Sequence, residues 1–281
     1  MTTTTPVSPP PARVITAPQQ PRGTKRRSFP TLRAILALML REMSTSYGRS
    51  PGGYVWAVAE PVAGIAFLSF VFAQVFRTPP IGVSFPMFYA TGMVPFVMFN
   101  DLHNKVAQSL MYSKSLLAYP TVTFVDALVA RFLTNLITHL MVAFLVLGGA
   151  MLLFEGPMNV DMLEVALGLS LVAFLGLGIG TLNAYLFMRV PVLQQAWSVL
   201  MRPMFIFSCA LIMYDSIPQP MRGWLWWNPI LHGVGAVRAG FYDIYDPYYV
   251  SPAYVLLVAL FCLMLGMLFL RAHHREMLSN T

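Results

Sequence analysis

Three polar residues recur at every fourth position inside one long apolar run of this sequence. Arg131, Asn135 and His139 lie within residues 123–153, and on a helix they share one face. Polar and charged side chains are costly in lipid, so they face protein or water. This face predicts a cationic, hydrogen-bonding lining for an anionic, hydroxyl-rich passenger. The alternative is that Arg131 extends to the membrane surface, as long basic side chains do.

Two further charges lie inside apolar runs. Arg202 lies near the middle of the run 192–214, and Glu60 lies near the start of the run 54–76, beside Pro61. Arg202 is the deepest charge, and arginine pairs well with carboxylates, so it is the strongest candidate for contact with an acidic passenger. Glu60 is expected to pair with a neighbouring helix.

The sequence motifs support no catalytic group in this chain. The sequence contains no Gly-x-x-x-x-Gly-Lys-Ser/Thr loop, so it has no phosphate cradle of its own. Asp243 and Asp246 form an Asp-x-x-Asp pair with no third ligand nearby, which is weak support for a metal site. Gly176-x-Gly178-x-Gly180 has the wrong spacing for a dinucleotide loop and indicates close helix packing instead. We therefore expect no catalytic residue, no metal and no cofactor in this chain.

One apolar stretch near the C-terminal end is too short to cross a membrane. Its uncharged part, residues 223–237, has 15 residues, whereas a spanning helix needs roughly 20. Asn228-Pro229 breaks it, because proline lacks an N–H and disfavours helix at the residue before it. The residues typical of the membrane boundary are Trp224, Trp226 and Trp227. We predict a re-entrant helical hairpin at about residues 215–250; the alternative is an interfacial loop with an aromatic belt.

The composition places most of the chain in lipid. Of its 281 residues, 57% are hydrophobic and 10% are charged, whereas soluble domains have about 25% charged residues. The net charge is +7, but the basic residues flank apolar runs, which is the pattern of membrane orientation rather than of nucleic-acid binding. The two cysteines lie inside apolar runs, without disulfide or metal spacing.

The chain is predicted to be an all-α integral membrane protein with six transmembrane helices. The predicted spans are 54–76, 84–104, 123–153, 164–188, 192–214 and 253–270. Lys and Arg gather before the first span and after the last, so both termini are expected in the cytoplasm. The expected parts are a disordered tail (1–24), an amphipathic interface helix (25–50), a permease domain (51–272) and a cytoplasmic tail (273–281).

Two cytoplasmic segments have the spacing of amphipathic helices. In residues 25–50 apolar residues recur at helical spacing with charges between them, which predicts a helix lying on the membrane surface. Residues 105–122 predict a second, shorter helix that ends before Pro120. The first segment is interpreted as an anchor for anionic lipid or as a docking helix for a soluble motor. The second is interpreted as a docking element or as a plain loop.

Two motifs give the chain a family resemblance. The first is Leu40-Arg41-Glu42 followed by Gly53-Tyr54-Val55-Trp56-Ala57 and Glu60-Pro61; the second is Asn228-Pro229-Ile230-Leu231-His232 with Arg238-Ala239-Gly240-Phe241-Tyr242. Together with the six-span layout, they make residues 30–272 resemble the membrane-spanning subunit of type-2 ATP-binding-cassette exporters. Within that class the chain is similar to the capsular polysaccharide export permeases and to their O-antigen relatives.

The resemblance implies a homodimer of this chain with two copies of a separate ATPase subunit, which binds ATP and Mg. It implies export of a lipid-linked polysaccharide across a bacterial inner membrane, within membrane lipid and together with a periplasmic adaptor and an outer-membrane channel. The candidates for ATPase docking are then Arg41, Glu42, Tyr112, Lys114 and Leu116. The candidates for the substrate path are Arg131, Asn135, His139, Arg202, Trp224, Trp226, Trp227, Arg238 and Tyr242. The long Thr/Pro-rich tail departs from the family pattern.

Three alternatives stay open at this point. The same architecture could export an O-antigen or another glycan, or it could export a drug or small lipid. A different class of function is a membrane enzyme that acts on a lipid-linked sugar, for which Asp243 and Asp246 are the nearest outer acids.

Overall fold

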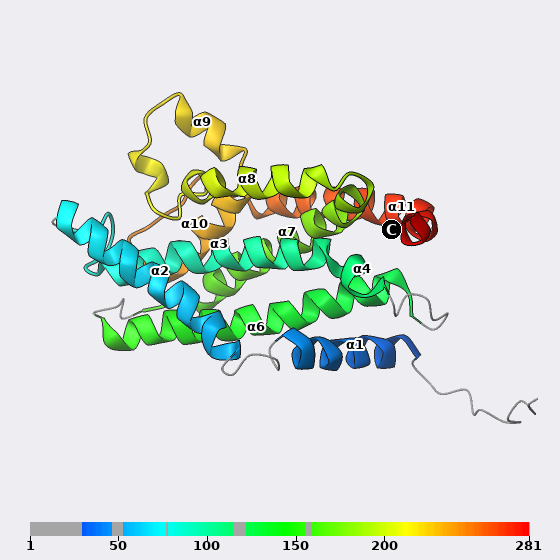
Figure 1. Cartoon of the computed structure of the whole chain (residues 1–281). Coiled ribbons are helices and arrows are strands. Elements are labelled where there is room, and N and C mark those ends of the chain that lie inside the picture. Colours follow the sequence, from blue (N-terminus) through cyan, green and yellow to red (C-terminus); the bar gives the residue numbers. More distant parts are fainter. Residues whose placement is uncertain (1–29, 47–52, 77, 115–121, 155–158, 281) are drawn as a thin grey trace, which may run out of the picture.

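The computed structural model describes residues 30–46, 53–76, 78–114, 122–154 and 159–280, and every regular element within these ranges is a helix (Figure 1). The helices are α1 (Pro30–Ser46), α2 (Gly53–Val75), α3 (Phe85–Ala107), α4 (Ser109–Tyr112), α6 (Phe124–Leu153), α7 (Met162–Arg189), α8 (Val192–Phe207), the 3₁₀ turn η1 (Tyr214–Ser216), α9 (Met221–Trp226), α10 (Pro229–Phe241) and α11 (Pro252–Asn280). The all-α prediction is confirmed. The tail 1–24, both ends of the predicted interface helix and Leu116 lie outside the described residues.

Helix α7 is the centre of the bundle, because it packs against α3, α10 and α11. Its glycines permit this close packing. A Cβ on Gly178 would lie 2.2 Å from the carbonyl oxygen of Ala259 in α11, and a Cβ on Gly180 would lie 2.8 Å from the carbonyl oxygen of His103 in α3. The predicted packing role of these glycines is confirmed.

Four of the described helices are long and apolar enough to cross a membrane: α2, α6, α7 and α11. Helix α3 has 23 residues, but its C-terminal part carries Asp101, His103 and Lys105. Helix α8 has 16 residues, which at 1.5 Å per residue is shorter than the hydrocarbon core of roughly 30 Å. The structure therefore supports an all-helical protein with four candidate spans.

Helix α8 ends at Phe207, before the predicted end at residue 214. The backbone turns there, and Cys209 has a φ of 56°. Arg238 of α10 donates hydrogen bonds to the carbonyl oxygens of Cys209 (2.6 Å), Ala210 (2.8 Å) and Ile212 (3.0 Å). Irregular backbone is tolerated at depth in a membrane protein where protein groups satisfy it, so this arginine explains why an apolar stretch need not stay helical.

The segment 215–250 contains two short helices, α9 and α10, with the predicted break between them. Asn228 is the N-cap of α10: its side-chain oxygen accepts a hydrogen bond from the backbone N–H of Ile230 (3.1 Å). Pro229 occupies the first turn, where a missing N–H costs nothing. The local chemistry of this dipeptide therefore produces the break, as the sequence predicts.

Helix α1 lies beside α6 (Figure 1). Its described span is narrower than residues 25–50, because the flanks of that range lie outside the described residues. The large apolar side chains that α1 leaves exposed are Leu32, Leu36, Leu40 and Met43. They recur at helical spacing, so α1 carries an exposed apolar stripe, and Met43 of this stripe also lines a groove beside α6.

Candidate functional site

Arg131 lies at a junction of four helices. Its Nη1 forms an ion pair with Oε1 of Glu42 in α1, at 3.3 Å, and both side chains are only 7% exposed. This contact is an ion pair rather than an aligned hydrogen bond, because Nη1 has no partner that meets hydrogen-bond geometry. The Nε group donates to the carbonyl oxygen of Lys105 at the end of α3 (3.1 Å). The guanidinium also lies over the ring of Tyr112 in α4, 4.1 Å from its centroid.

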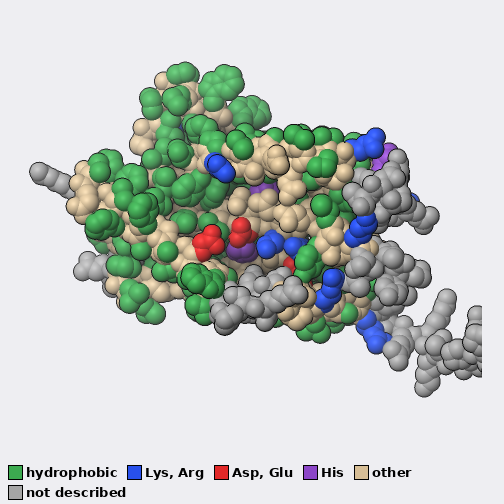
Figure 2. All heavy atoms as spheres, viewed as in Figure 1, with side chains coloured by type: hydrophobic (Ala, Val, Ile, Leu, Met, Phe, Trp, Pro, Cys, Tyr) green, Lys and Arg blue, Asp and Glu red, His purple; other side chains and the backbone are tan. Residues whose placement is uncertain are grey.

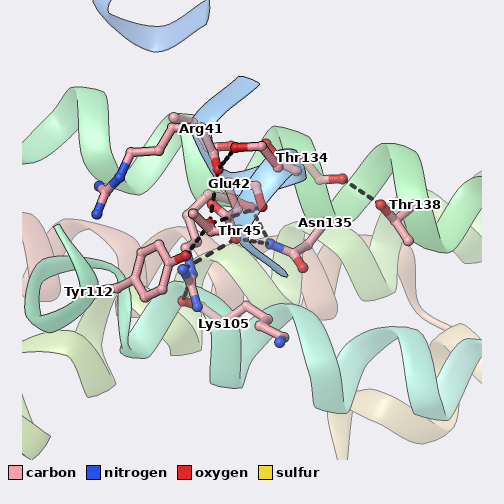
Figure 3. Close-up of polar contacts among 11 residues, drawn as sticks. Arg41, Glu42, Thr45, Lys105, Tyr112, Thr134, Asn135 and Thr138 are labelled. Atoms are coloured by element: carbon pink, nitrogen blue, oxygen red, sulfur yellow. Dashed lines mark hydrogen bonds and ion pairs between the residues drawn. The ribbon is translucent and has the colours of Figure 1, made fainter. Parts of the chain in front are cut away.

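Glu42 points from α1 into the bundle (Figure 3). Its Oε1 accepts a hydrogen bond from Nδ2 of Asn135 (3.1 Å), one helical turn from Arg131. Burial raises the pKa of the Glu42 carboxyl, and the positive charge of Arg131 opposes that shift. An ionised Glu42 is therefore held by one cation and one amide.

Tyr112 connects α4 to α1. Its hydroxyl hydrogen-bonds to the hydroxyl of Thr45, and its ring lies 5.3 Å from the guanidinium of Arg41 (Figure 3). The ring therefore has Arg41 of α1 and Arg131 of α6 as two cationic neighbours. Lys114, just beyond α4, is half-buried.

The start of α6 is fixed by local chemistry. The hydroxyl of Thr123 accepts from the backbone N–H of Asp126 (3.2 Å), while the Asp126 carboxylate accepts from the backbone N–H of Thr123 (2.8 Å). This capping box sets the register of the helix, and therefore the face on which Arg131, Asn135 and His139 lie. The predicted shared face is present, but two of its members contact a predicted docking residue, Glu42.

His139, the third member of this face, contacts α3 and not α1. Its Nε2 lies 3.3 Å from Oδ2 of Asp101, whose side chain is 43% exposed. Over α3 and α6, Figure 2 shows acidic, histidine and basic side chains together in the middle of a largely hydrophobic face. The half-exposed polar side chains of α3 are Asn100, Asp101, Asn104 and Lys105.

Sequence reasoning missed this polar face of α3. The spacing that indicates this face is visible in the sequence: Asn100 and Asn104, and likewise Asp101 and Lys105, are four residues apart and therefore lie on one side of a helix.

Sequence reasoning also missed His103, which is buried and joins two helices. Its Nε2 accepts a hydrogen bond from the indole N–H of Trp197 in α8 (2.7 Å). The sequence around His103 gives no sign of this partner, because Trp197 lies 94 residues further along the chain.

Arg202 lies on the exposed side of α8, where it is the sequence candidate for contact with an acidic passenger. Within the single chain only one side chain of this helix, Met201, is fully buried. Helix α8 is therefore weakly covered by its own chain, and its charge is open to a ligand or to a second chain.

Two of the three candidate tryptophans are exposed: Trp224 is 79% exposed and Trp227 is 65% exposed. They line an open apolar groove of about 530 Å³ between the end of α8 and α9. Trp226 is half-buried, and its indole N–H donates to the carbonyl oxygen of Tyr249 (3.1 Å). The two exposed rings can meet a ligand, whereas Trp226 also holds α9 against the following loop.

Arg238 and Tyr242 are buried, unlike Arg202, Trp224 and Trp227. Besides its three carbonyl partners, the guanidinium of Arg238 lies 4.4 Å from the ring centroid of Phe88. The ring of Tyr242 packs against Gly82. In the single chain both residues therefore act as supports for the fold around α10, and neither is open to a ligand.

The described residues contain no group of three or more His, Cys, Asp or Glu side chains placed to hold a metal ion. Asp243 and Asp246 follow α10 in the loop before α11. The polar groups of the site are instead suited to hydrogen bonding, ion pairing and contact between helices.

A comparison with known protein families identifies the chain. The sequence model of the family described as "ABC-2 type transporter" matches residues 33–242, which include the four-helix junction, α8 and α10. The chain belongs to this family. As an ABC-2 type transporter it is the membrane component, and ATP hydrolysis falls to a partner subunit.

Three relatives of this ABC-2 type transporter align over most of their length. The polysialic acid transport protein KpsM of Escherichia coli is 28% identical over 244 residues, which cover 87% of this chain and 95% of KpsM. The capsule polysaccharide export inner-membrane protein CtrC of Neisseria meningitidis is 24% identical over 236 residues, covering 84% and 89%. The protein of the same description from Haemophilus influenzae, BexB, is 23% identical over 243 residues, covering 85% and 90%.

Proposed function

We propose that this chain is the membrane subunit of an ATP-driven exporter that moves lipid-linked capsular polysaccharide outward across a bacterial inner membrane. One observation carries the proposal. The chain aligns with 89–95% of the length of three relatives whose names describe polysialic acid transport or capsule polysaccharide export.

The proposed membrane arrangement has six spans. Helices α2, α6, α7 and α11 have the length and composition required. Helix α3 supplies a fifth span, with its polar end near the cytoplasm, and α8 with the turn after it supplies the sixth. Helices α9 and α10 form the re-entrant hairpin on the outer side, and both termini lie in the cytoplasm. The basic residues before α1 and in the C-terminal part of α11 support this orientation.

The proposed assembly contains two copies of this chain and two ATPase subunits, with a periplasmic adaptor and an outer-membrane polysaccharide channel. The weak coverage of α8 in the single chain supports a second copy. The exposed apolar side chains of α8 include Val192, Val199, Leu200 and Ile206. In a homodimer these side chains and Arg202 would face the partner or a path between the two chains.

The polysaccharide path is proposed to run along the polar face of α3 and past Arg202. Asn100 and Asn104 offer amides to sugar hydroxyls, and Lys105 and Arg202 offer cations to sugar carboxylates. The exposed rings of Trp224 and Trp227 would stack on sugar faces at the outer end. This path differs from the one predicted from the sequence in two ways. It includes the polar face of α3, and it leaves out Arg131 and Asn135, because these two side chains contact Glu42 of α1.

The experiment that tests the function is reconstitution of this chain with its ATPase subunit in lipid vesicles, with lipid-linked capsular polymer in the membrane. The expected result is movement of polymer to the opposite leaflet and lumen that requires ATP. The matched control is the same complex with an ATPase subunit that binds but does not hydrolyse ATP. Hydrolysis by the complex without any movement of polymer would contradict the proposal.

A further inference from the structure

The geometry points to a mechanical joint formed by Arg131 and Glu42, which makes α1, α4 and α6 move as one body. This inference rests on the proposed function in one respect: the partner ATPase must push on the cytoplasmic elements. Glu42 was predicted to contact the ATPase and Arg131 the polysaccharide. The structure brings the two side chains together instead, 3.3 Å apart and buried.

Four helices meet at the guanidinium of Arg131. Arg131 belongs to α6, pairs with Glu42 of α1, donates to the carbonyl of Lys105 at the end of α3 and lies over the ring of Tyr112 in α4. The joint therefore connects α6 to both elements that sequence analysis named as docking candidates. It is one place where both elements contact the same membrane-spanning helix.

Opening the joint is unfavourable. Both charged side chains are 7% exposed, so separating α1 from α6 breaks an ion pair that is shielded from water and leaves each charge without its partner. Buried pairs are screened much less than exposed ones, so this loss is larger than for a surface ion pair. Asn135 would lose its hydrogen bond to Glu42 as well. Displacement of α1 is therefore expected to pull α6 along rather than to break the contact.

Apolar packing between α1 and α6 is incomplete. Beside the joint lies an open apolar groove of about 280 Å³ between the two helices. Its lining residues are Met39, Met43, Thr134, Ile137, Thr138 and Met141. Because side chains do not fill this groove, the polar joint is the tighter link between the helices.

Tyr112 connects α4 to the same joint. Its ring lies near Arg41 of α1 and Arg131 of α6, and its hydroxyl bonds to Thr45 of α1. The short helix α4 is thereby tied to both helices. A displacement of α1 or of α4 acts on the same guanidinium, so the joint can transmit force from both docking elements to α6.

Charge substitution in the full complex tests the joint functionally. Glu42→Gln and Arg131→Gln are each expected to leave ATP hydrolysis within about twofold and to lower polymer exported per ATP by about tenfold, the size of effect expected from losing one buried ionic contact. The reversed pair, Glu42→Arg with Arg131→Glu, is expected to recover part of the loss, because it restores the ion pair but not the contacts of Arg131 with Lys105 and Tyr112. The matched control is Glu164→Gln, which makes the same change at the exposed start of α7.

Normal export per ATP in both single variants would overturn the joint. The joint would also be overturned if the reversed pair folded normally but exported as little polymer per ATP as the single variants. The pairing of the two charges would then have no effect on export.

A distance measurement tests the joint without any polymer. Spin labels replace the exposed Leu36 of α1 and Leu140 of α6, in a chain whose two cysteines are replaced by alanine. In the complex with the ATPase, this distance is expected to be the same with and without ATP, while a label pair from Leu36 to Leu257 of α11 changes. Glu42→Gln is expected to make the α1–α6 distance depend on ATP.

An ATP-dependent α1–α6 distance in the native pair, or no change in either pair of labels, would contradict the joint. Because this readout does not involve polymer, failure of the joint can be told apart from failure of the proposed export function.

Discussion

Three arginines inside the apolar part of this chain have three different environments. Arg131 is paired with a carboxylate, Arg238 is held by backbone carbonyls, and Arg202 is exposed on α8. The residue type alone predicts only that each charge avoids lipid. The partners decide which arginine supports the fold and which is open to a ligand.

Substitution of Arg238 is expected to destabilise the protein. Arg238→Met removes the donor for the carbonyl groups of Cys209, Ala210 and Ile212, which then lie buried without partners. The expected loss is on the order of 3 kcal/mol in the free energy of unfolding. Thermal unfolding in detergent measures it, with Arg202→Met as the matched control at an exposed position. Equal unfolding temperatures for the two variants would contradict the structural role.

Substitution of Arg202 is expected to affect transport rather than stability. Arg202→Ala removes an exposed cation, so its unfolding temperature should stay native while export of an acidic polymer falls by about tenfold. Polymer export in reconstituted vesicles is the measurement. Arg271→Ala, at another exposed arginine near the end of α11, serves as control. Unchanged export in both Arg202→Ala and Trp227→Ala would remove these residues from the path.

At the scale of the elements, α7 holds the bundle together through close backbone contacts. Gly178→Ala places a Cβ within 2.2 Å of the carbonyl oxygen of Ala259, which is backbone and cannot rotate away. Helices α7 and α11 must then separate, at a cost of roughly 1–3 kcal/mol. Gly148→Ala is the matched control, because a Cβ there meets no atom within 4 Å. Unfolding of the two variants by denaturant compares them, and equal stability would show that α7 does not need its glycines.

The hairpin of α9 and α10 is expected on the outer side of the membrane. A cysteine at Trp224, in a chain without Cys209 and Cys262, should react with a membrane-impermeant thiol reagent added from outside. A cysteine at Arg271, after the last apolar stretch, should react only from the cytoplasmic side. Labelling of position 224 from the cytoplasm, or from neither side, would contradict a re-entrant hairpin at the outer face.

For the whole molecule, the features that follow from local chemistry could be predicted from the sequence. The break at Asn228-Pro229 follows from a capping side chain and a proline in the first turn. Helix positions follow from apolar runs of spanning length, and the shared face of Arg131 and His139 follows from their spacing.

Features that depend on distant partners could not be predicted. The end of α8 depends on Arg238, which is 31 residues beyond Phe207 and replaces helical hydrogen bonds with its own. The partner of Arg131 is Glu42. The interpretation of residues 25–50 as a surface helix predicted that Glu42 faces the cytoplasm instead. Apolarity and spacing do not identify such contacts, because they describe one segment at a time.

The most direct test of the account as a whole is the location of capsular polymer in cells of the native host that lack this chain. We expect that polymer disappears from the cell surface and accumulates in the cytoplasm, and that the native chain restores the surface polymer. The chain with Glu42→Gln should restore it only weakly. Normal surface polymer in cells without the chain would contradict the central claim that this protein carries capsular polysaccharide across the inner membrane.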